Sequence, residues 1–326
     1  MTVLIFNEAE VRRHLTPIEC IEAMRQAMIA LSRGQTQQLP REIMTMSGGR
    51  MLGIMPGAMN ADADFGAKII SVFPQNFAEG RPSHQGAVMI FDAETGALKI
   101  LAHAGEITAI RTGATSAAAT DALARKDASQ LAILGYGHQA FSHARAISKI
   151  RNLSKITIWG RDKERRTAAA ANLEKELGVS CEPKASAGEA VKDADIICTV
   201  TGAKDPILFG SDAPDGAHIN VVGSSFNGPA EVDSDLVVKS VYFADHRPSV
   251  IAQGTEYIRA HNAGLIDETH IAAEIGEVFD GKHTGRRSDG EITLYKSLGH
   301  IVQDLAGAIL LAHKAAENSI GLTVDF

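Results

Sequence analysis

The sequence lacks the features of several protein classes. Its three cysteines, Cys20, Cys181 and Cys198, are far apart and form no Cys-x-x-Cys pair, so they predict neither a disulfide framework nor a zinc site. We expect buried thiols and no metal. No block of lysines and arginines is dense enough to neutralise a run of phosphates, and the formal charge is -7, which argues against nucleic acid as a partner.

Long apolar segments are also missing. No window approaches the ~18 apolar residues that a membrane span requires, and the start, MTVLIFNEAEVRRHL, has no signal-peptide pattern. We therefore expect no membrane partner and a cytoplasmic location. The 45% hydrophobic and 22% charged residues are typical of a globular chain, and the 326 residues suffice for about two domains.

The first third of the chain predicts a helix followed by a sheet. Thr16-Pro17 and the apolar residues that follow at helical spacing predict an amphipathic helix that ends before Gly34. Short apolar or alternating runs, separated by Gly, Pro and Asn, then predict a mixed or antiparallel sheet. Its strands are expected at 53–55, 66–73, 85–91 and 98–102. A tightly packed helix rich in Ala and Thr is predicted over 106–125.

After Asp127 the pattern alternates between strands and helices. It starts with the strand LAIL, a helix from His138, the strand KITIW and a helix over 163–177; further strands are expected at 195–200, 218–222 and 240–244. This alternation predicts right-handed βαβ units and a parallel sheet. A last helix is predicted over 295–315. The fold class is therefore α/β: a Rossmann domain plus an α+β domain with a mixed sheet.

The segment LAILGYGHQA, residues 131–140, carries a Gly-x-Gly-x-x-Ala pattern between a strand and a helix. Gly135 permits the tight turn and Gly137 lets the backbone approach a pyrophosphate, while the first helical turn, with His138 and Gln139, offers free N–H groups. The context predicts a dinucleotide site. The alternative is a glycine turn in another kind of α/β protein.

The end of the second strand bears on the ribose of the cofactor. NAD sites usually place an acid there, whereas a 2′-phosphate needs a cation. This chain has Trp159-Gly160-Arg161, which favours NADP(H). NAD(H) stays open, because Asp162 follows and Arg161 is alternatively a surface charge.

The order of motifs resembles the ornithine cyclodeaminase/mu-crystallin family over nearly the whole chain. The matching segments are LPR (39–41), IMP (54–56), AKIISVFPQN (67–76), EITAIRTGATSA (106–117), GYGHQA (135–140), VGSS (222–225), LYKSLG (294–299) and QD (303–304). The resemblance implies a homodimer. It also implies a substrate-binding and dimerisation domain over 1–115 and 302–326, with a Rossmann NAD(P)-binding domain over 116–301.

The resemblance further implies that Arg41, Lys68 and Arg111 hold the carboxylate of an amino or imino acid over the nicotinamide. Such a clamp supplies charge-assisted hydrogen bonds and a fixed orientation. Lys68 stands in an otherwise apolar strand, so it needs an anionic partner or a lowered pKa; either would suit a group that keeps an imine protonated. The alternatives are an edge-strand Lys68 that reaches solvent and a surface Arg41.

Other family positions contribute by analogy. His84 follows the lysine strand and is a candidate for the distal end of the substrate, and Ser225 is a second candidate on the catalytic side. The remaining cofactor candidates are Thr112, Ser116, Thr201, Gly223, Ser224, Lys296 and Ser297. Thr201 is expected on the adenosine side, and Ser224, Ser225 and Lys296 near the nicotinamide.

Three positions depart from the cyclodeaminase branch. Gly53, Ser225 and Lys296 stand where that branch carries acids that serve a diamine substrate. The chain is therefore closer to the ketimine reductases: an NAD(P)H-dependent oxidoreductase acting on CH-NH or CH-NH2 groups. We expect it to reduce a small α-imino acid, such as Δ1-pyrroline-2-carboxylate, iminosuccinate or the imine of pyruvate, to the L-amino acid. The alternatives are a cyclodeaminase that converts ornithine to proline and ammonia with bound NAD, and a non-catalytic ligand-binding protein.

Overall fold

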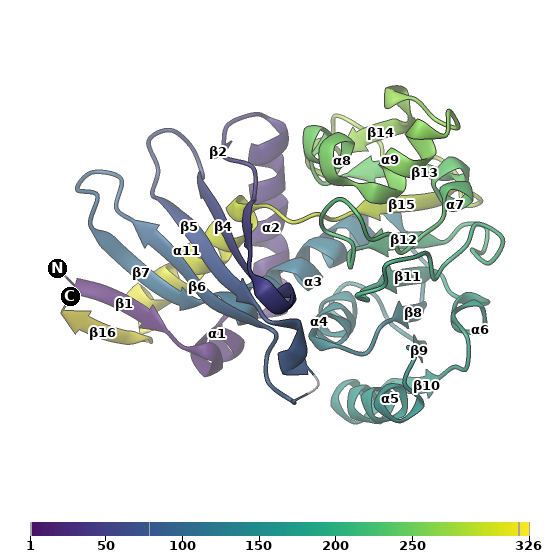
Figure 1. Cartoon of the computed structure of the whole chain (residues 1–326), viewed down its shortest axis with the longest axis horizontal. Helices are drawn as coiled ribbons and strands as arrows, with labels where there is room; N and C mark the ends of the chain where they lie inside the picture. Colours follow the sequence, from purple (N-terminus) through teal and green to yellow (C-terminus); the bar gives the residue numbers. More distant parts are fainter. Residues whose placement is uncertain (1, 78, 319, 326) are drawn as a thin grey trace. The chain divides into compact units, whose positions relative to one another are not determined.

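The computed structural model of the chain describes residues 2–77, 79–318 and 320–325, and it contains two compact units (Figure 1). Unit 1 comprises Met1–Arg111 and His300–Phe326, and unit 2 comprises Thr112–Gly299. The assignment of a substrate-binding and dimerisation domain and of an NAD(P)-binding domain to these parts of the chain stays a prediction. Unit 1 contains a mixed sheet and unit 2 a parallel sheet, which confirms the predicted fold class.

Unit 1 is built on an eight-stranded sheet in the order β16-β1-β7-β6-β5-β4-β2, with β3 paired to β4. Neighbouring strands are antiparallel except β1 and β7. The elements are β1 (Thr2–Phe6), α1 (Glu8–His14), α2 (Pro17–Ser32), β2 (Gln37–Gln38), β3 (Glu42–Thr45), η1 (Ser47–Gly49), β4 (Met51–Ala58), β5 (Phe65–Val72), η2 (Pro74–Phe77), β6 (His84–Phe91), β7 (Leu98–His103), the start of α3 (Ala104–Leu123), α11 (Ile301–Asn318) and β16 (Leu322–Asp325).

Helix α2 forms where the sequence predicts it. Thr16 is its N-cap residue, Pro17 occupies the first turn, and the helix ends at Ser32, before Gly34 with its φ of +65°. Proline suits the first turn because its missing N–H would have no helical partner there. Helix α2 packs against α11, and α11 crosses strands β4 to β7 (Figure 1). The start of α11 is thereby brought to the middle of the sheet of unit 1.

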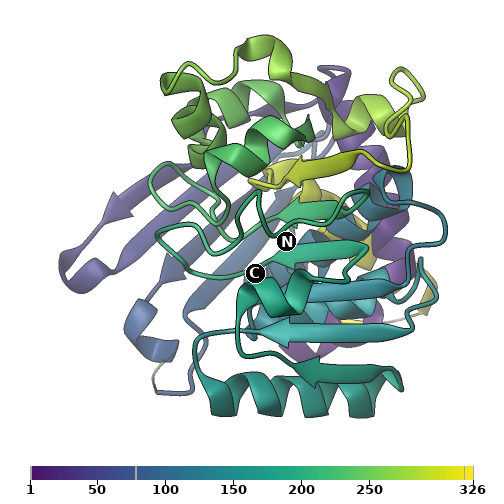
Figure 2. The ribbon, with the colours of Figure 1, turned by 90° about the vertical axis from the view of Figure 1, so that its right-hand side faces the viewer.

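Unit 2 contains an all-parallel sheet in the order β10-β9-β8-β11-β12-β15-β13-β14; the strands are seen stacked in Figure 2. Its elements, after the end of α3, are β8 (Gln130–Leu134), α4 (His138–Ile147), β9 (Lys155–Trp159), α5 (Lys163–Leu177), β10 (Ser180–Pro183), α6 (Ala187–Val191), β11 (Ile196–Thr199), β12 (His218–Val221), α7 (Ser234–Lys239), β13 (Ser240–Ala244), α8 (Arg247–Gln253), α9 (Thr255–Asn262), η3 (Glu268–His270), β14 (Ile271–Glu274), α10 (Ile275–Phe279) and β15 (Ile292–Lys296).

The strand order reverses next to β8. Strands β9 and β10 lie on one side of β8, and β11 and β12 lie on the other. In open parallel sheets ligands bind beyond the carboxyl ends of the strands at such a switch point. The glycine-rich segment that follows β8 is therefore in the position that a dinucleotide site requires.

The prediction of a helix over 295–315 is wrong for its first residues. Residues Ile292–Lys296 form β15, a buried strand between β12 and β13, and α11 begins only at Ile301. Gly299, with a φ of +82°, lies in the connection, and a helix cannot run through that conformation. A short apolar run does not distinguish a buried strand from a helical turn by its periodicity.

Two other expectations concern the three cysteines and membrane-spanning helices. Cys20, Cys181 and Cys198 are buried free thiols, as predicted. Among the helices of the described residues, none is both long enough and apolar enough to cross a membrane.

Candidate active site

Strand β5 places Lys68 inside unit 1. The strand lies between β4 and β6, with Lys68 opposite Met55 and Val88, and only 3% of the residue is exposed. An edge-strand lysine that reaches solvent is therefore the wrong interpretation. A buried ammonium requires an anionic partner.

That partner is Asp304, in the first turn of α11. Lys68 Nζ lies 2.8 Å from Asp304 Oδ2, and Arg111 Nε lies 3.0 Å from Oδ1. Arg111 Nη1 also donates to Gln303 Oε1 at 2.7 Å, and Thr108 Oγ1 lies 3.4 Å from both Lys68 Nζ and Asp304 Oδ1. One buried carboxylate thus joins a strand lysine to an arginine on α3.

The pKa values of this cluster reflect burial and neighbouring charges. Desolvation lowers the pKa of Lys68 to about 8; Arg111 and Arg41 act in the same direction, while Asp304 opposes it. For Asp304, burial favours the neutral form, but Arg111 and Lys68 outweigh it and the pKa is lowered. A proton on Lys68 is therefore held less tightly than a proton on an exposed lysine.

Arg41 and His84 lie close enough to Lys68 for electrostatic interaction: the charge of Arg41 lowers the pKa of Lys68, and the charge of Lys68 lowers the pKa of His84. Arg41 is half-buried in the loop before β3. His84 begins β6 with exposed surface, yet surrounding atoms desolvate its ring, and this lowers its pKa together with the charges of Lys68 and Arg41. His84 pairs with Val72 in the sheet, so it shares the Lys68 face. Unit 1 thus brings together the four predicted substrate-side residues Arg41, Lys68, His84 and Arg111.

Gly53 lies on the same sheet face. It pairs with Ile70 in β5, two residues from Lys68, and residues two apart on a strand point to the same side. A Cβ at this position would meet the Ile70 side chain at 3.5 Å, an ordinary contact. Position 53 therefore places no side chain, and no carboxylate, beside Lys68.

The turn after β8 has the shape expected of a dinucleotide loop. Gly135 has a φ of +137°, and a Cβ there would lie 2.8 Å from the carbonyl oxygen of Val200, so only glycine is accommodated. At Gly137, the N-cap residue of α4, a Cβ would meet nothing within 4 Å, and no side chain caps the helix. A helix start without a side-chain cap, at a turn that a ligand can approach closely, suits the oxygens of a phosphate. His138 is exposed at this helix start, and Gln139 Oε1 is buried without a partner among the described residues.

The segment after β9 presents a cation, Arg161, and holds its acid, Asp162, in a helix cap. The carbonyl of Trp159 accepts a hydrogen bond from Gly135 N–H, and a Cβ on Gly160 would lie 2.1 Å from the ring of Tyr136. Arg161 is exposed. The Asp162 carboxylate caps α5 by accepting the Arg165 N–H at 2.9 Å.

Several predicted cofactor residues are held by partners within unit 2. Ser116 is fully buried and bonds at 2.9 Å to His143 Nε2, while His143 Nδ1 lies 2.8 Å from the carbonyl of Gln139. Burial lowers the pKa of His143 to about 4, so the ring is neutral. Ser116 thus holds the first turns of α4 against α3, on which Thr112 is also buried.

Lys296 is also paired. It is fully buried, its Nζ lies 2.8 Å from Glu256 Oε2, and it donates to both oxygens of Ser224 at 2.6 Å. Ser297 is buried and donates its N–H to Val221. Lys296 and Ser224 therefore shape the loop after β12, on which Ser225 is half-buried.

Thr201 and Gly223 contact a residue that the sequence did not single out. Glu231 accepts hydrogen bonds from the backbone N–H and hydroxyl of Thr201 and from the N–H of Gly223. Asp304 and Glu256 were missed as well, although Asp304 belongs to the QD motif. The available signal was the two lysines in apolar strands, Lys68 and Lys296, because a buried lysine requires a carboxylate partner. The spacing of residues along the chain does not identify which carboxylate that is.

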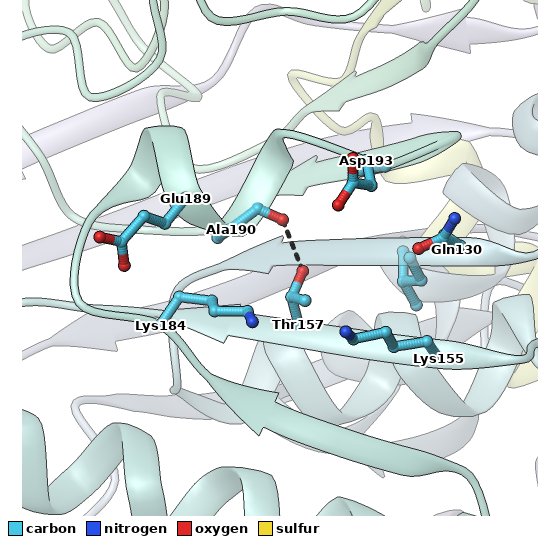
Figure 3. Close-up of a pocket in the computed structure, with 9 residues that line it drawn as sticks. Gln130, Lys155, Thr157, Lys184, Glu189, Ala190 and Asp193 are labelled. Atoms are coloured by element: carbon cyan, nitrogen blue, oxygen red, sulfur yellow. Dashed lines mark hydrogen bonds between the residues drawn. The ribbon is translucent and has the colours of Figure 1, made fainter.

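A cavity of about 30 Å³ lies between α6 and strands β8 and β9 of unit 2 (Figure 3). It is lined by Gln130, Leu131, Lys155, Thr157, Lys184, Glu189, Ala190, Asp193 and Ala194. This volume holds little more than a water molecule, and the lining contains none of the predicted site residues. Among the described residues, no group of three or more His, Cys, Asp or Glu is arranged to hold a metal ion.

Comparison with known proteins identifies related sequences over most of the chain. The model of the ornithine cyclodeaminase/mu-crystallin family matches residues 2–319. A Δ1-pyrroline-2-carboxylate reductase of Bacillus cereus is 34% identical over 274 residues, which cover 84% of each chain. Ketimine reductase mu-crystallin of Mus musculus is 34% identical over 260 residues, covering 80% of this chain and 79% of the relative.

Solved structures resemble the chain over its full length. Thermococcus litoralis Δ1-pyrroline-2-carboxylate reductase in complex with NADH and L-proline has a TM-score of 0.95 at 32% identity, covering 99% of this chain and 100% of that one. An archaeal alanine dehydrogenase dimer with bound NAD has a TM-score of 0.92 at 26% identity, and iminosuccinate reductase of Paracoccus denitrificans with NAD+ has 0.91 at 27%. Both match 100% of each chain.

Proposed function

This chain belongs to the ornithine cyclodeaminase/mu-crystallin family, and on that premise we propose that it is an NAD(P)-dependent reductase of small α-imino acids. The observation that carries the proposal is the buried cluster of Lys68, Arg111 and Asp304 in unit 1. Two cations beside one carboxylate, with Arg41 nearby, leave a net positive charge that suits the carboxylate of a substrate. The related reductases and their NADH and NAD+ complexes support a nicotinamide cofactor.

A bound reduced nicotinamide supplies a hydride to the substrate carbon. Arg111 and Arg41 would hold the substrate carboxylate and fix its orientation. Lys68, with its pKa of about 8, would keep the imine nitrogen protonated, which makes the adjacent carbon electrophilic. Asp304 would hold Lys68 and Arg111 in place.

Δ1-Pyrroline-2-carboxylate is the first substrate to test, because relatives at 34% and 32% identity are reductases of this compound. Iminosuccinate is the second candidate, since His84 lies on the Lys68 face of the sheet of unit 1 and would suit a second carboxylate. Ornithine cyclisation is disfavoured. Neither Gly53 nor Ser225 supplies a carboxylate, and Lys296 is tied to Glu256.

For the cofactor we favour NADP(H), although the related structures contain NADH or NAD. Gly160 presents no acid to the ribose, and Asp162 is engaged as a helix cap. Arg161 is exposed, and Arg166 Nη1 donates to the carbonyl of Gly160 at 3.1 Å. Two guanidinium groups at the end of β9 would suit a 2′-phosphate.

We further propose a homodimer formed through unit 1. Met44 and Ile54 are 56% and 38% exposed, and their strand register places them on the sheet face opposite to Lys68. Exposed apolar side chains on a sheet face suit a protein partner. The archaeal alanine dehydrogenase structure is of a dimer. The cytoplasmic location stays a prediction.

The test is a steady-state assay of imino acids with both reduced cofactors. We expect the absorbance of NADPH or NADH to fall with Δ1-pyrroline-2-carboxylate, and we expect no ammonia release from ornithine. The panel also includes iminosuccinate and pyruvate with ammonia. If neither cofactor is oxidised with any imino acid, the proposed activity is wrong.

A further inference from the structure

The segment after β12 carries a buried acid that the proposed chemistry does not use. Glu231 is fully buried. Its Oε1 accepts from the Thr201 N–H at 2.6 Å and from the Thr201 hydroxyl at 2.7 Å. Its Oε2 accepts from the Gly223 N–H at 2.6 Å and from the Thr199 hydroxyl at 2.8 Å. One carboxyl group therefore joins the segment after β11 to the segment after β12.

These two segments lie on one side of the switch point. The sheet order β9-β8-β11-β12 places β9, whose end reads the adenosine ribose, on the other side of the glycine turn. The nicotinamide half of a dinucleotide then extends over the ends of β11 and β12. This differs from the adenosine-side position expected for Thr201 from the sequence. We propose that Glu231 is a positioning residue that sets these two segments for the nicotinamide half of the cofactor.

The packing leaves little freedom between the two segments. A Cβ on Gly223 would lie 2.1 Å from the carbonyl oxygen of Thr201 and 2.6 Å from Oε1 of Glu231. The two backbones therefore meet directly, with the carboxyl group of Glu231 as the bridge. We therefore expect loss of that bridge to move backbone atoms and not only a side chain.

A second carboxylate supports the first. Glu256 accepts the backbone N–H of Glu231 at 3.0 Å, forms a hydrogen bond with the Ser224 hydroxyl and pairs with Lys296 at 2.8 Å. This contact fixes where Glu231 stands relative to β15 and α9. Burying several charged groups is costly unless each is paired and hydrogen-bonded, and here each carboxyl group has charge-bearing or backbone partners. The network determines the position of the loop over residues 222–225.

The geometry makes glutamine a sharp test. Each oxygen of Glu231 accepts one backbone N–H, from Thr201 or from Gly223. In Glu231→Gln, either orientation of the amide points an NH2 donor at one of those N–H groups. The substitution keeps the side chain's size and releases one of the two segments.

The experiment measures binding and not turnover. Affinities for NADH and for ADP-ribose, which lacks the nicotinamide, are determined by calorimetry for the wild type and for Glu231→Gln. We expect NADH to bind at least tenfold more weakly to the variant and ADP-ribose to change less than twofold. Asp233→Asn is the matched control. It alters an acid two residues away that accepts the N–H groups of Gly210 and Leu236, and we expect neither affinity to change.

The outcomes separate this proposal from the function on which it rests. Unchanged NADH binding by a folded Glu231→Gln, or equal losses for NADH and ADP-ribose, would overturn the role of Glu231. A wild-type protein that binds neither NADH nor NADPH would contradict the nicotinamide cofactor and with it this proposal. If Glu231→Gln does not fold, Thr201→Val removes one hydroxyl donor to the carboxyl group, and the same selective loss for NADH is expected at smaller size; its absence also overturns the proposal.

Discussion

Lys68 and Asp304 form an ion pair at 2.8 Å inside unit 1, although 236 positions separate them in the sequence. The same carboxylate receives Arg111 Nε at 3.0 Å. Two buried cations would repel each other without it, and an unpaired buried charge is strongly destabilising. Substitutions in this cluster should therefore change substrate turnover or the free energy of unfolding and leave cofactor affinity unchanged.

Lys68→Ala should abolish reductase activity and leave cofactor binding intact. Loss of a positioned proton donor lowers turnover by roughly 10²–10⁴-fold, whereas Lys68 belongs to unit 1 and the glycine turn to unit 2. Steady-state kinetics and calorimetric titration with NADPH measure the two effects. Lys99→Ala, which removes a 43% exposed lysine side chain of the same sheet, is the control. A variant with normal turnover but lost cofactor affinity would show that Lys68 is misassigned.

The activity should decline as the pH rises through about 8. Desolvation lowers the pKa of Lys68 to about 8, and the protonated form is the one that acts, so its fraction falls above that pH. We expect kcat/KM to lose roughly tenfold per pH unit on the alkaline side. In Lys68→Arg the guanidinium stays charged throughout, and any residual activity should lack this limb. An identical alkaline limb in that variant would assign it to another group.

Asp304→Asn should destabilise the protein and shift the alkaline limb. The change leaves Lys68 and Arg111 without their anion, which costs about 3–5 kcal/mol of unfolding free energy. The pKa of Lys68 should fall further, because Asp304 raises it, so the limb moves to lower pH. Urea unfolding and the pH profile measure both. Arg145→Gln breaks the more exposed pair with Glu176 and should cost about 0–1 kcal/mol; equal losses in the two variants would refute the prediction.

Arg161→Ala should weaken NADPH binding far more than NADH binding. A charge-assisted contact to the 2′-phosphate is worth about 1.5–3 kcal/mol, roughly tenfold or more in affinity, and NADH lacks that phosphate. Titration of both cofactors gives the ratio. Lys163→Ala, two residues along in the first turn of α5, serves as the control. Equal effects of Arg161→Ala on the two cofactors would indicate an NAD(H) enzyme.

Much of unit 2 could be predicted because its signals are local. The turn at Gly135 and Gly137 follows an apolar strand and opens a helix, and both neighbours lie within a few residues. The helix over 163–177 was predicted at the bounds that α5 has. The order of β15 in the sheet could not be predicted, because its position between β12 and β13 depends on strands about 50 or more residues away in the chain.

The sequence indicated residues of the candidate site but not the partners that hold them. Lys68 in an apolar strand indicated a need for an anion, and Arg111 came from the family pattern. Asp304 was only part of a motif, and Glu231 carried no local signal. Ser116 and Lys296 bond to His143 and Glu256, partners that the sequence did not indicate, since buried polar groups must find partners wherever the fold brings them; their place near the cofactor stays a prediction.

The sequence by itself determined the βαβ unit, the glycine turn, the charge types available for a substrate and the absence of acids at positions 53, 225 and 296. Those features depend on residue identity and on contacts between near neighbours in the chain. Only the tertiary structure decided which carboxylate meets which cation. Electrostatic and hydrogen-bond energies depend on distances in space, and the packing of α11 on β5 and of β15 beside β12 sets those distances.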